Sequence, residues 1–264
     1  MMADSNQGPI LPFSDGPAVP AFDRNWCFFM DIDGTLLEFA ERPDAVTADA
    51  EVKAILRDLQ AIAAGAVALI SGRPIADIDR LFAPLRFPAA GQHGIERRGH
   101  AGDLHIHEAP AARLQDAVKK LERLIAKYSG LVFENKGATL ALHYRLAPHL
   151  APEAERIMRE LHDDLGSEFE LQSGKMLVEI KPSGKDKGTA IAEFMDEAPF
   201  RGRTPVFIGD DLTDEYGFAL VNRRGGHSVK VGAGTSAANW RLADAQAVRA
   251  WLRAIVGQYS QYAT

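Results

Sequence analysis

The sequence predicts an α/β protein with a doubly wound, mainly parallel sheet and an inserted α+β domain. Three observations lead to this prediction. Short apolar runs alternate with segments of helical periodicity over residues 25–102 and again after residue 182, the pattern of parallel strands buried on both faces. Between these regions the strands become half-polar, which is typical of a sheet with one open face. Each of three apolar runs ends in polar or acidic residues, where open α/β sheets carry their ligand sites.

The first region follows a proline- and glycine-rich stretch, residues 1–24, which we expect to be a disordered tail. Its predicted strands are Trp26–Met30, Ala66–Ile70 and Phe87–Ala90. Apolar residues at helical spacing predict a helix over about 48–64, with Thr47 as its N-cap. The same spacing predicts a second helix that starts near Ile75.

The middle and last regions complete the expected order of elements. In the middle region we predict helices over 114–125 and from Pro152 onward, and strands over Leu131–Glu134, Ala138–Tyr144 and Met176–Ile180. In the last region we predict a helix over 190–195, strands over Pro205–Gly209 and Val229–Val231, and a closing helix near 248–255. We therefore assign 25–102 and 183–264 to one discontinuous domain and 103–182 to the inserted domain.

Composition excludes several classes of partner. The net charge of −6 argues against nucleic acid and anionic membranes, which both favour positive proteins. Cys27 is the only cysteine, so no disulfide within the chain is possible, and no apolar stretch reaches the roughly 20 residues that span a bilayer. We expect a cytoplasmic monomer. An acidic protein that binds an anionic substrate must make its site locally positive.

The sharpest motif is Asp31-Ile32-Asp33-Gly34-Thr35, directly after a predicted buried strand. Two carboxylates at a strand end can face the same crevice, where one attacks phosphorus and the other handles the proton of the leaving oxygen. Keeping two anions together requires a cation such as Mg²⁺, which prefers oxygen ligands. Turn chemistry also supplies Asp and Gly, but the apolar strand before the motif and Thr35 after it favour the functional interpretation.

Three further motifs lie at strand ends or helix starts. Four acidic residues in Gly209–Glu215 follow a predicted strand, and they repel one another unless a cation is bound. Ser71-Gly72-Arg73-Pro74 combines a hydroxyl, a flexible backbone and a helix start, the parts of an anion site. Lys187, at the start of a predicted helix, can neutralise charge on a phosphoryl group. Each of the last two is weak alone, and their convergence favours a phosphoryl-transfer site.

These motifs, in this order, resemble the four motifs of the haloacid dehalogenase superfamily. Within it, the chain resembles the trehalose-6-phosphate phosphatase family over about residues 26–256. The segments that carry the resemblance are Ser71–Pro74, Gly91–Gly94, His143–Arg145, Gly174–Pro182 and Gly209–Glu215. The resemblance implies hydrolysis of trehalose 6-phosphate, the last step of trehalose biosynthesis, with Mg²⁺ as cofactor. It also implies that the inserted domain is a type II cap.

The resemblance also implies a role for each residue. Asp31 is the expected nucleophile, and Asp33 the expected acid and then base. The expected metal ligands are Asp31, the backbone carbonyl of Asp33, Asp210 and Asp214, with Asp211 nearby. The phosphoryl group is expected to contact Asp31, Asp33, Thr35, Ser71, Arg73 and Lys187.

Sugar recognition is expected from the cap. Lys175 and Glu179 lie four positions apart in a predicted strand, which places both on one face. An exposed ion pair worth about 0–1 kcal/mol is the simpler interpretation of this pair. The resemblance implies instead that both bind sugar hydroxyls, with Glu134 and with help from Lys136 and Arg145. His93, between Gly91 and Gly94, is expected to shape a turn.

Other functions compete with this interpretation. A phosphatase for sucrose phosphate or a glycosylglycerate phosphate would keep the Asp31 chemistry, and only Glu134, Lys175 and Glu179 would discriminate. A receiver-like module that accepts a phosphoryl group also gathers acids around Mg²⁺, but it needs no inserted domain. A catalytically silent binding protein is disfavoured because all the chemical residues are present.

Overall fold

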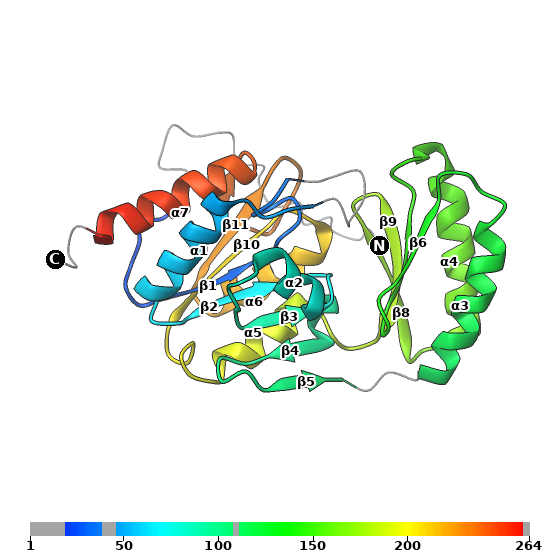
Figure 1. Cartoon of the computed structure of the whole chain (residues 1–264), viewed down its shortest axis with the longest axis horizontal. Coiled ribbons are helices and arrows are strands. Elements are labelled where there is room, and N and C mark those ends of the chain that lie inside the picture. The colour runs from blue at the N-terminus through cyan, green and yellow to red at the C-terminus, as the bar shows by residue number, and fades with distance from the viewer. Residues whose placement is uncertain (1–18, 39–45, 108–110, 261–264) are drawn as a thin grey trace, which may run out of the picture.

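The computed structural model describes residues 19–38, 46–107 and 111–260, which form two bodies lying side by side (Figure 1). The larger body, the core, is built on an eight-stranded sheet, and the smaller body, the cap, on a four-stranded sheet. The cap is inserted between two parts of the core. The predicted α/β class with an inserted α+β cap is confirmed.

The core sheet is parallel except at one edge. Its strands lie in the order β12 (Trp240–Leu242), β11 (His227–Val231), β10 (Thr204–Gly209), β1 (Trp26–Met30), β2 (Val67–Ile70), β3 (Ala89–Gly91), β4 (Glu96–Arg98) and β5 (Leu104–Ile106). Only β4 and β5 run antiparallel to their neighbours. The central strands β1 and β2 are buried along their whole length, which explains why they appear in the sequence as unbroken apolar runs.

The register of the central strands brings the acidic motifs together. Met30, the last residue of β1, lies opposite Ile208 of the parallel strand β10. Asp31 and Asp210 therefore leave the sheet at the same edge, as expected for parallel strands. The positive φ of Gly34, 82°, turns the chain just after the first motif, a conformation that favours glycine.

Helices cover both faces of the core sheet. Helix α1 (Ala50–Ile62) packs against α7 (Ala245–Ser260), and α5 (Lys187–Met195) packs against α6 (Glu215–Arg223) (Figure 1). Helix α2 (Ile75–Phe82) packs against β3 and β4, next to the edge strand β5. Apolar side chains from these helices and the strands form one buried cluster. Among the described residues, no helix combines the length and apolar character that crossing a membrane requires.

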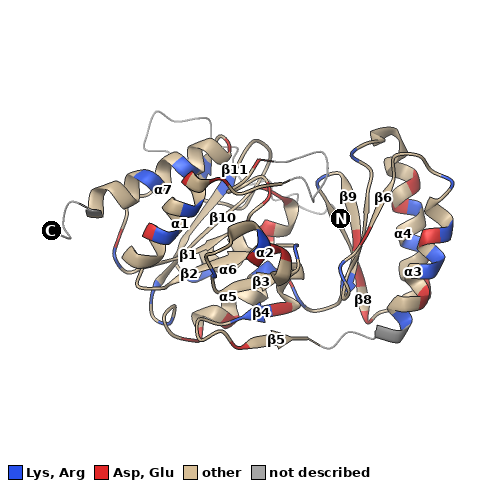
Figure 2. Cartoon of the chain, viewed as in Figure 1, with Lys and Arg blue, Asp and Glu red and all other residues tan. Residues whose placement is uncertain are grey.

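The cap is an antiparallel sheet with two helices on one face. Its strands lie in the order β6 (Val132–Asn135), β7 (Leu140–His143), β9 (Leu177–Pro182) and β8 (Phe169–Gly174). Helices α3 (Ala111–Ile125) and α4 (Ala151–Leu165) form the layer farthest from the core, and charged residues of both signs are spread along them (Figure 2). The other face of the cap sheet is turned toward the core (Figure 1). Short 3₁₀ turns span Gln92–Gly94, Pro148–Leu150 and Leu212–Asp214.

The structure differs from the sequence prediction at several elements. The strands β4, β5, β8 and β12 and the helix α6 were not predicted. Residues 104–106, expected in the cap, form β5 of the core sheet. The N-cap of α1 is Asp49 rather than Thr47, because the Asp49 carboxylate accepts a hydrogen bond from the Val52 amide at 2.9 Å.

The predicted tail is only partly described. Residues 1–18 lie outside the described part of the chain. Val19 and Phe22 pack against the core, and the ring of Phe22 lies 5.5 Å from that of Trp26. The last residues of the expected tail therefore belong to the folded core.

Candidate active site

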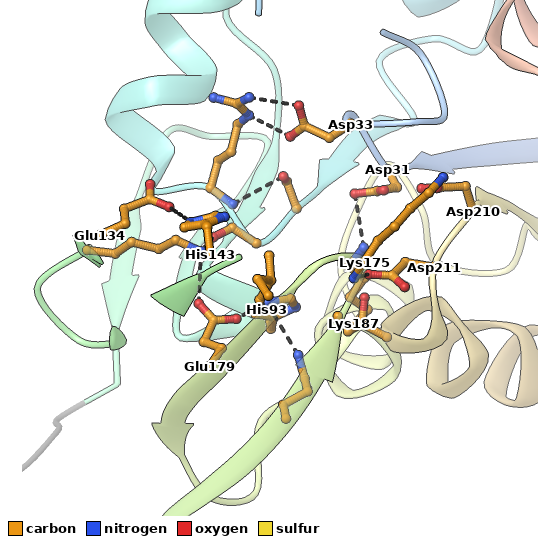
Figure 3. A pocket seen from close by; sticks show the side chains of 18 of the residues that line it. Asp31, Asp33, His93, Glu134, His143, Lys175, Glu179, Lys187, Asp210 and Asp211 are labelled. Atoms are coloured by element: carbon orange, nitrogen blue, oxygen red, sulfur yellow. Dashed lines mark hydrogen bonds and ion pairs between the residues drawn. The ribbon is translucent and has the colours of Figure 1, made fainter. Parts of the chain in front are cut away.

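The carboxyl edge of the core sheet gathers three carboxylates around one lysine. Asp31 follows β1, Asp210 follows β10, and Asp214 ends the 3₁₀ turn after β10. Lys187 is the first residue of α5, whose N-cap Asp186 accepts a hydrogen bond from Thr189. The Lys187 Nζ lies 2.9 Å from Asp31 Oδ1 and 2.6 Å from Asp214 Oδ1. The sequence motifs predicted this convergence, and Figure 3 shows Lys187 pointing to Asp31.

The arrangement of the carboxylates fits a bound cation. Oxygen atoms of Asp31, Asp210 and Asp214 all lie within 4.8 Å of one another. Burial and the other two aspartates raise the pKa of Asp31 well above its ordinary value, although Lys187 opposes this effect. Burial, with Asp214 beside it, raises the pKa of Asp210 to about 6. Lys187 and the half-exposed Lys175, whose Nζ lies 3.5 Å from Asp210 Oδ2, bring two positive charges to three carboxylates. The group therefore stays short of positive charge, which a hard divalent cation with oxygen ligands would supply.

Asp33 lies outside this carboxylate group. The Arg73 guanidinium holds it with two hydrogen bonds, 2.6 Å from Nε to Oδ2 and 2.7 Å from Nη2 to Oδ1. Arg73 follows β2 in the predicted anion-binding turn, where its backbone amide donates to Ser71 Oγ at 3.2 Å. A bidentate pair fixes the orientation of both planar groups. The side chain of Asp33 is thus aimed at Arg73 rather than at the other acids.

Thr35 is placed differently from the expected phosphate contact. Its side chain is fully buried, and its hydroxyl lies 3.5 Å from Asp210 Oδ1. It is not among the residues that line the pocket. Thr35 therefore contacts the carboxylate of Asp210 from the buried interior and not from the pocket.

A pocket lies between this edge of the core and the face of the cap sheet that is turned toward the core. Its core side is lined by Asp31, Asp33, Ser71, Arg73, Lys187 and Asp210. Its cap side is lined by Glu134, Lys136, His143, Arg145, Gln172, Lys175 and Glu179. Apart from Thr35 and Asp214, every residue predicted at the site lines this one pocket (Figure 3).

Glu179 and Lys175 do not share an exposed strand face, and that prediction is wrong. Lys175 lies in the turn between β8 and β9, with its side chain 53% exposed and its Nζ 3.5 Å from Asp210 Oδ2. Glu179 lies within β9 and is only 1% exposed, because the core covers that face of the cap sheet. The charged partner of Glu179 in the cap is Lys136, at 2.8 Å.

A network of polar contacts surrounds Glu179. Its Oε1 accepts hydrogen bonds from Lys136 Nζ at 2.8 Å and Thr139 Oγ1 at 3.0 Å, and its Oε2 lies 2.8 Å from His93 Nε2. Lys136 also donates to the Gly72 carbonyl of the core at 3.0 Å. Burial alone would raise the pKa of Glu179, but the charge of Lys136 and the hydrogen bonds from His93 and Lys136 hold it far below its ordinary value.

Sequence reasoning gave no site role to four polar residues of the pocket: His93, His143, Gln172 and Thr213. His143 of β7 lies 2.8 Å from the carboxylate of Glu134, and Gln172 lies on β8. His93 was expected only to shape a turn, yet its side chain is buried against the cap. The sequence did offer a signal for His143, because period-two alternation places it on the same face of its strand as Ala141, opposite the apolar face. Gln172 lies on a strand that was not predicted.

Asp211, expected near the metal, contacts the cap instead. Its Oδ2 accepts a hydrogen bond from the backbone amide of Lys175 at 3.2 Å, and its Oδ1 accepts from Leu212 at 2.7 Å. It is not in the group of three close carboxylates. Asp211 therefore joins the cap hairpin to the acidic edge of the core.

Comparison with known proteins identifies the family of the chain. The model of the trehalose-phosphatase family matches residues 29–246. The chain belongs to the trehalose-phosphatase family. A member of this family, the trehalose-6-phosphate phosphatase of Escherichia coli, is 47% identical over 246 residues, which cover 92% of this chain and 91% of that protein.

Solved structures share the fold. A trehalose-6-phosphate phosphatase related protein superposes with a TM-score of 0.76 at 25% identity, covering 89% of this chain and 99% of that one. A phosphatase of the haloalkanoate superfamily from Bacteroides thetaiotaomicron superposes with a TM-score of 0.59 at 13% identity, covering 94% and 99%. The second likeness concerns the fold alone. It places this member of the trehalose-phosphatase family on the same scaffold of core and cap.

Proposed function

We propose that this chain hydrolyses trehalose 6-phosphate to trehalose and phosphate, the last step of trehalose biosynthesis, through a phosphoaspartate on Asp31 and with Mg²⁺ as cofactor. The observation that carries the proposal is the pairing of Asp31 with Lys187 beneath a polar cap pocket, in a chain of the trehalose-phosphatase family. The names of its relatives support the substrate.

The reaction has two steps. In the first, a carboxylate oxygen of Asp31 attacks phosphorus, the bond from phosphorus to the sugar oxygen breaks, and that oxygen takes a proton from Asp33. In the second, water gives a proton to Asp33 and attacks the same phosphorus, which releases phosphate and restores the Asp31 carboxylate. Lys187 and Arg73 supply positive charge to the phosphoryl oxygens in both steps.

The pair formed by Asp33 and Arg73 describes the state before substrate binds. Both carboxylate oxygens of Asp33 accept hydrogen bonds from Arg73, so in this state Asp33 is held by Arg73 and is not free to turn toward a leaving oxygen. A phosphate group is an alternative bidentate partner for Arg73. Substrate would therefore take over Arg73 and release Asp33 to reach the leaving oxygen.

The residues that would hold Mg²⁺ are Asp31, Asp210 and Asp214, together with the backbone carbonyl of Asp33. Bound there, the ion would neutralise charge on the phosphoryl oxygens and orient the phosphate. Support comes from the three carboxylates within 4.8 Å and from the raised pKa values of Asp31 and Asp210.

Sugar hydroxyls would bind to the cap side of the pocket. We assign Glu134 and Glu179 as acceptors and Lys175 as a donor, with Lys136 and Arg145 beside them. All five line the pocket across from Asp31. A closed cap would exclude water from the phosphoryl group and keep large phosphoproteins out.

We also propose that the enzyme acts in the cytoplasm as a monomer. Cys27 is its only cysteine, so the chain needs no internal disulfide, which suits a reducing compartment. The large apolar side chains exposed in the described part of the chain lie on separate segments. These are Leu104 and Ile106 on β5, Leu146 in the cap, and Leu212 and Tyr216 near α6.

The decisive experiment is phosphate release from trehalose 6-phosphate beside sucrose 6-phosphate, glucose 6-phosphate and p-nitrophenyl phosphate, each with Mg²⁺ and with EDTA. We expect a strong Mg²⁺-dependent preference for trehalose 6-phosphate, and no turnover in the control variant Asp31→Asn. Preference for another sugar phosphate would keep the Asp31 chemistry and reject the assigned substrate. Full activity in EDTA would reject the cofactor.

A further inference from the structure

His93 is a residue of the core that reaches into the cap. It lies in the 3₁₀ turn directly after β3, and it is 7% exposed. Its Nε2 lies 2.8 Å from Oε2 of Glu179, which belongs to β9 of the cap. Figure 3 shows the two side chains pointing toward each other. The phosphoryl-transfer chemistry described above makes no use of His93.

The chemistry of Glu179 determines which ring nitrogen of His93 carries the proton. An ionised carboxylate only accepts hydrogen bonds, so His93 must donate from Nε2–H. The other nitrogen, Nδ1, is buried and has no hydrogen-bond partner among the described residues. Burial lowers the pKa of His93, in agreement with a neutral ring. The amide of Gln172 lies farther from Nε2, at 3.5 Å, and does not replace Glu179 as its partner.

This proton leaves Glu179 with one acceptor position for a ligand. Each carboxylate oxygen accepts about two hydrogen bonds. Oε1 already accepts from Lys136 and Thr139. Oε2 accepts from His93, which leaves one position on Oε2 among the described contacts. The hydrogen bond from His93 occupies one lone pair of Oε2 and so determines the direction in which the remaining lone pair points.

The backbone around His93 is built to hold the ring in place. Gln92 and His93 have φ values of 47° and 59°, in the left-handed region that non-glycine residues rarely adopt. The His93 amide donates to the Ser71 carbonyl at 3.0 Å, and the Gln92 amide to the Arg73 carbonyl at 2.9 Å. A Cβ on Gly72 would lie 2.8 Å from His93 Nε2, so the glycine of the anion-binding turn makes room for the ring.

We propose that His93 is a positioning residue that donates its Nε2 proton to Glu179 and so orients the remaining acceptor of Glu179 toward a sugar hydroxyl. This deepens the proposed function and rests on it. Because the same turn is tied to Ser71 and Arg73, His93 sets the distance between the sugar site in the cap and the phosphoryl site in the core. A strained turn is retained here because it links the two sites.

The test is a double-mutant cycle between His93→Ala and Glu179→Gln, with kcat and KM measured for trehalose 6-phosphate. Loss of a hydrogen bond to a charged group predicts that His93→Ala raises KM about 10- to 100-fold, with kcat changed less than about threefold. In the Glu179→Gln background the same substitution should raise KM less than about twofold. His93→Gln keeps an N–H donor at a similar reach and should restore most of the lost binding. His149→Ala, on an exposed 3₁₀ turn of the cap, is the matched control.

Several outcomes would overturn the proposal. An equal KM rise in both backgrounds would show that His93 acts without Glu179. Loss of kcat in His93→Ala with unchanged KM, or no rescue by His93→Gln, would show a different role. If the wild-type chain does not act on trehalose 6-phosphate, the proposed function fails separately. In that case the nitrogen-15 chemical shifts of the His93 ring still test the positioning role. The proposal requires that they show the neutral tautomer with the proton on Nε2, and that they change in Glu179→Ala.

Discussion

Replacing Lys187 by methionine tests whether charge holds the acidic edge of the core together. Lys187 is 3% exposed and contacts both Asp31 and Asp214. Methionine keeps an unbranched chain of similar length and removes only the positive charge and its hydrogen bonds. The variant would leave the buried carboxylates of Asp31 and Asp214 without the lysine that pairs with them, and only the half-exposed Lys175 would remain, beside Asp210.

The expected cost follows from this geometry. Breaking a buried ion pair by removing one partner costs about 3–5 kcal/mol. For a chain of this size, about 3 kcal/mol corresponds to a fall in Tm of roughly 6–12 °C. Because Mg²⁺ would bind the same carboxylates, it should stabilise the variant by an amount that grows with its concentration, about 2.7 kcal/mol at 100 times Kd. At least half of the loss should therefore return in excess Mg²⁺.

The sign of the pH dependence can also be worked out. The two carboxylates raise the pKa of Lys187, so its contribution is fully present below the unfolded pKa, about 10.4, and does not vary between pH 5 and 8. The pKa values of Asp31 and Asp210 are raised, that of Asp210 to about 6. A raised pKa means that the folded state binds the proton more tightly, so stability falls as pH rises through that value. The loss of Tm in Lys187→Met should be larger at pH 8 than at pH 5.

The assay is thermal unfolding of wild type and variant in EDTA and in Mg²⁺, at pH 5 and pH 8. Lys185→Met is the matched control, because Lys185 pairs with Glu193 outside the acidic edge. The control should lose less than about 1 kcal/mol and should not respond differently to Mg²⁺. A fall in Tm of the same size under all four conditions would refute the reasoning and assign Lys187 a packing role.

Three further predictions concern single residues. Asp31→Asn should lower phosphate release from trehalose 6-phosphate more than about 10⁴-fold in a colorimetric assay, and normal turnover would reject Asp31 as the nucleophile. Glu179→Ala should lower kcat/KM for trehalose 6-phosphate about 10- to 100-fold, and unchanged selectivity over p-nitrophenyl phosphate would reject its contact with sugar. Asp211→Ala should raise KM about three- to tenfold by freeing the cap hairpin, without changing the Mg²⁺ concentration that gives half-maximal activity. A changed Mg²⁺ requirement would instead make Asp211 a metal ligand.

The core strands and the acidic motifs could be predicted because burial marks them in the sequence. The strands β1 and β2 have no exposed face, so their sequences are unbroken apolar runs, and each ends where the polar residues begin. In a parallel sheet those ends meet at one edge. The placement of Asp31, Asp210 and Ser71 at one edge therefore follows from the pattern, and their closeness follows from the strand order β10-β1-β2 that the structure shows.

The edge strands and the cap face could not be predicted in the same way. Strand β4 has only three residues, Glu96–Arg98, and pairs between two other short strands, so it carries no apolar run. Lys175 was expected in a strand because the alternation of Met176, Val178 and Ile180 was extended back to it, although Ser173-Gly174 just before it is a turn signal. Met176, at a φ of 66°, is a residue that rarely adopts this conformation. Glu179 was expected on an open face, and its burial results from the contact between core and cap.

The charges of the pocket explain how an acidic protein can accept an anionic substrate. Its lining holds five basic side chains and six acidic ones, so the side chains alone do not make the pocket positive. On the cap side Glu134 and Glu179 are each paired, with His143 and with Lys136, and they offer acceptors rather than free negative charge. On the core side the unbalanced charge lies in the carboxylates around Asp31. A divalent cation bound there would reverse the net charge where the phosphate must bind. The ion that relieves the repulsion between the aspartates would thus also allow the anionic substrate to bind. Protein without the metal should therefore show both weaker phosphate binding and a lower Tm.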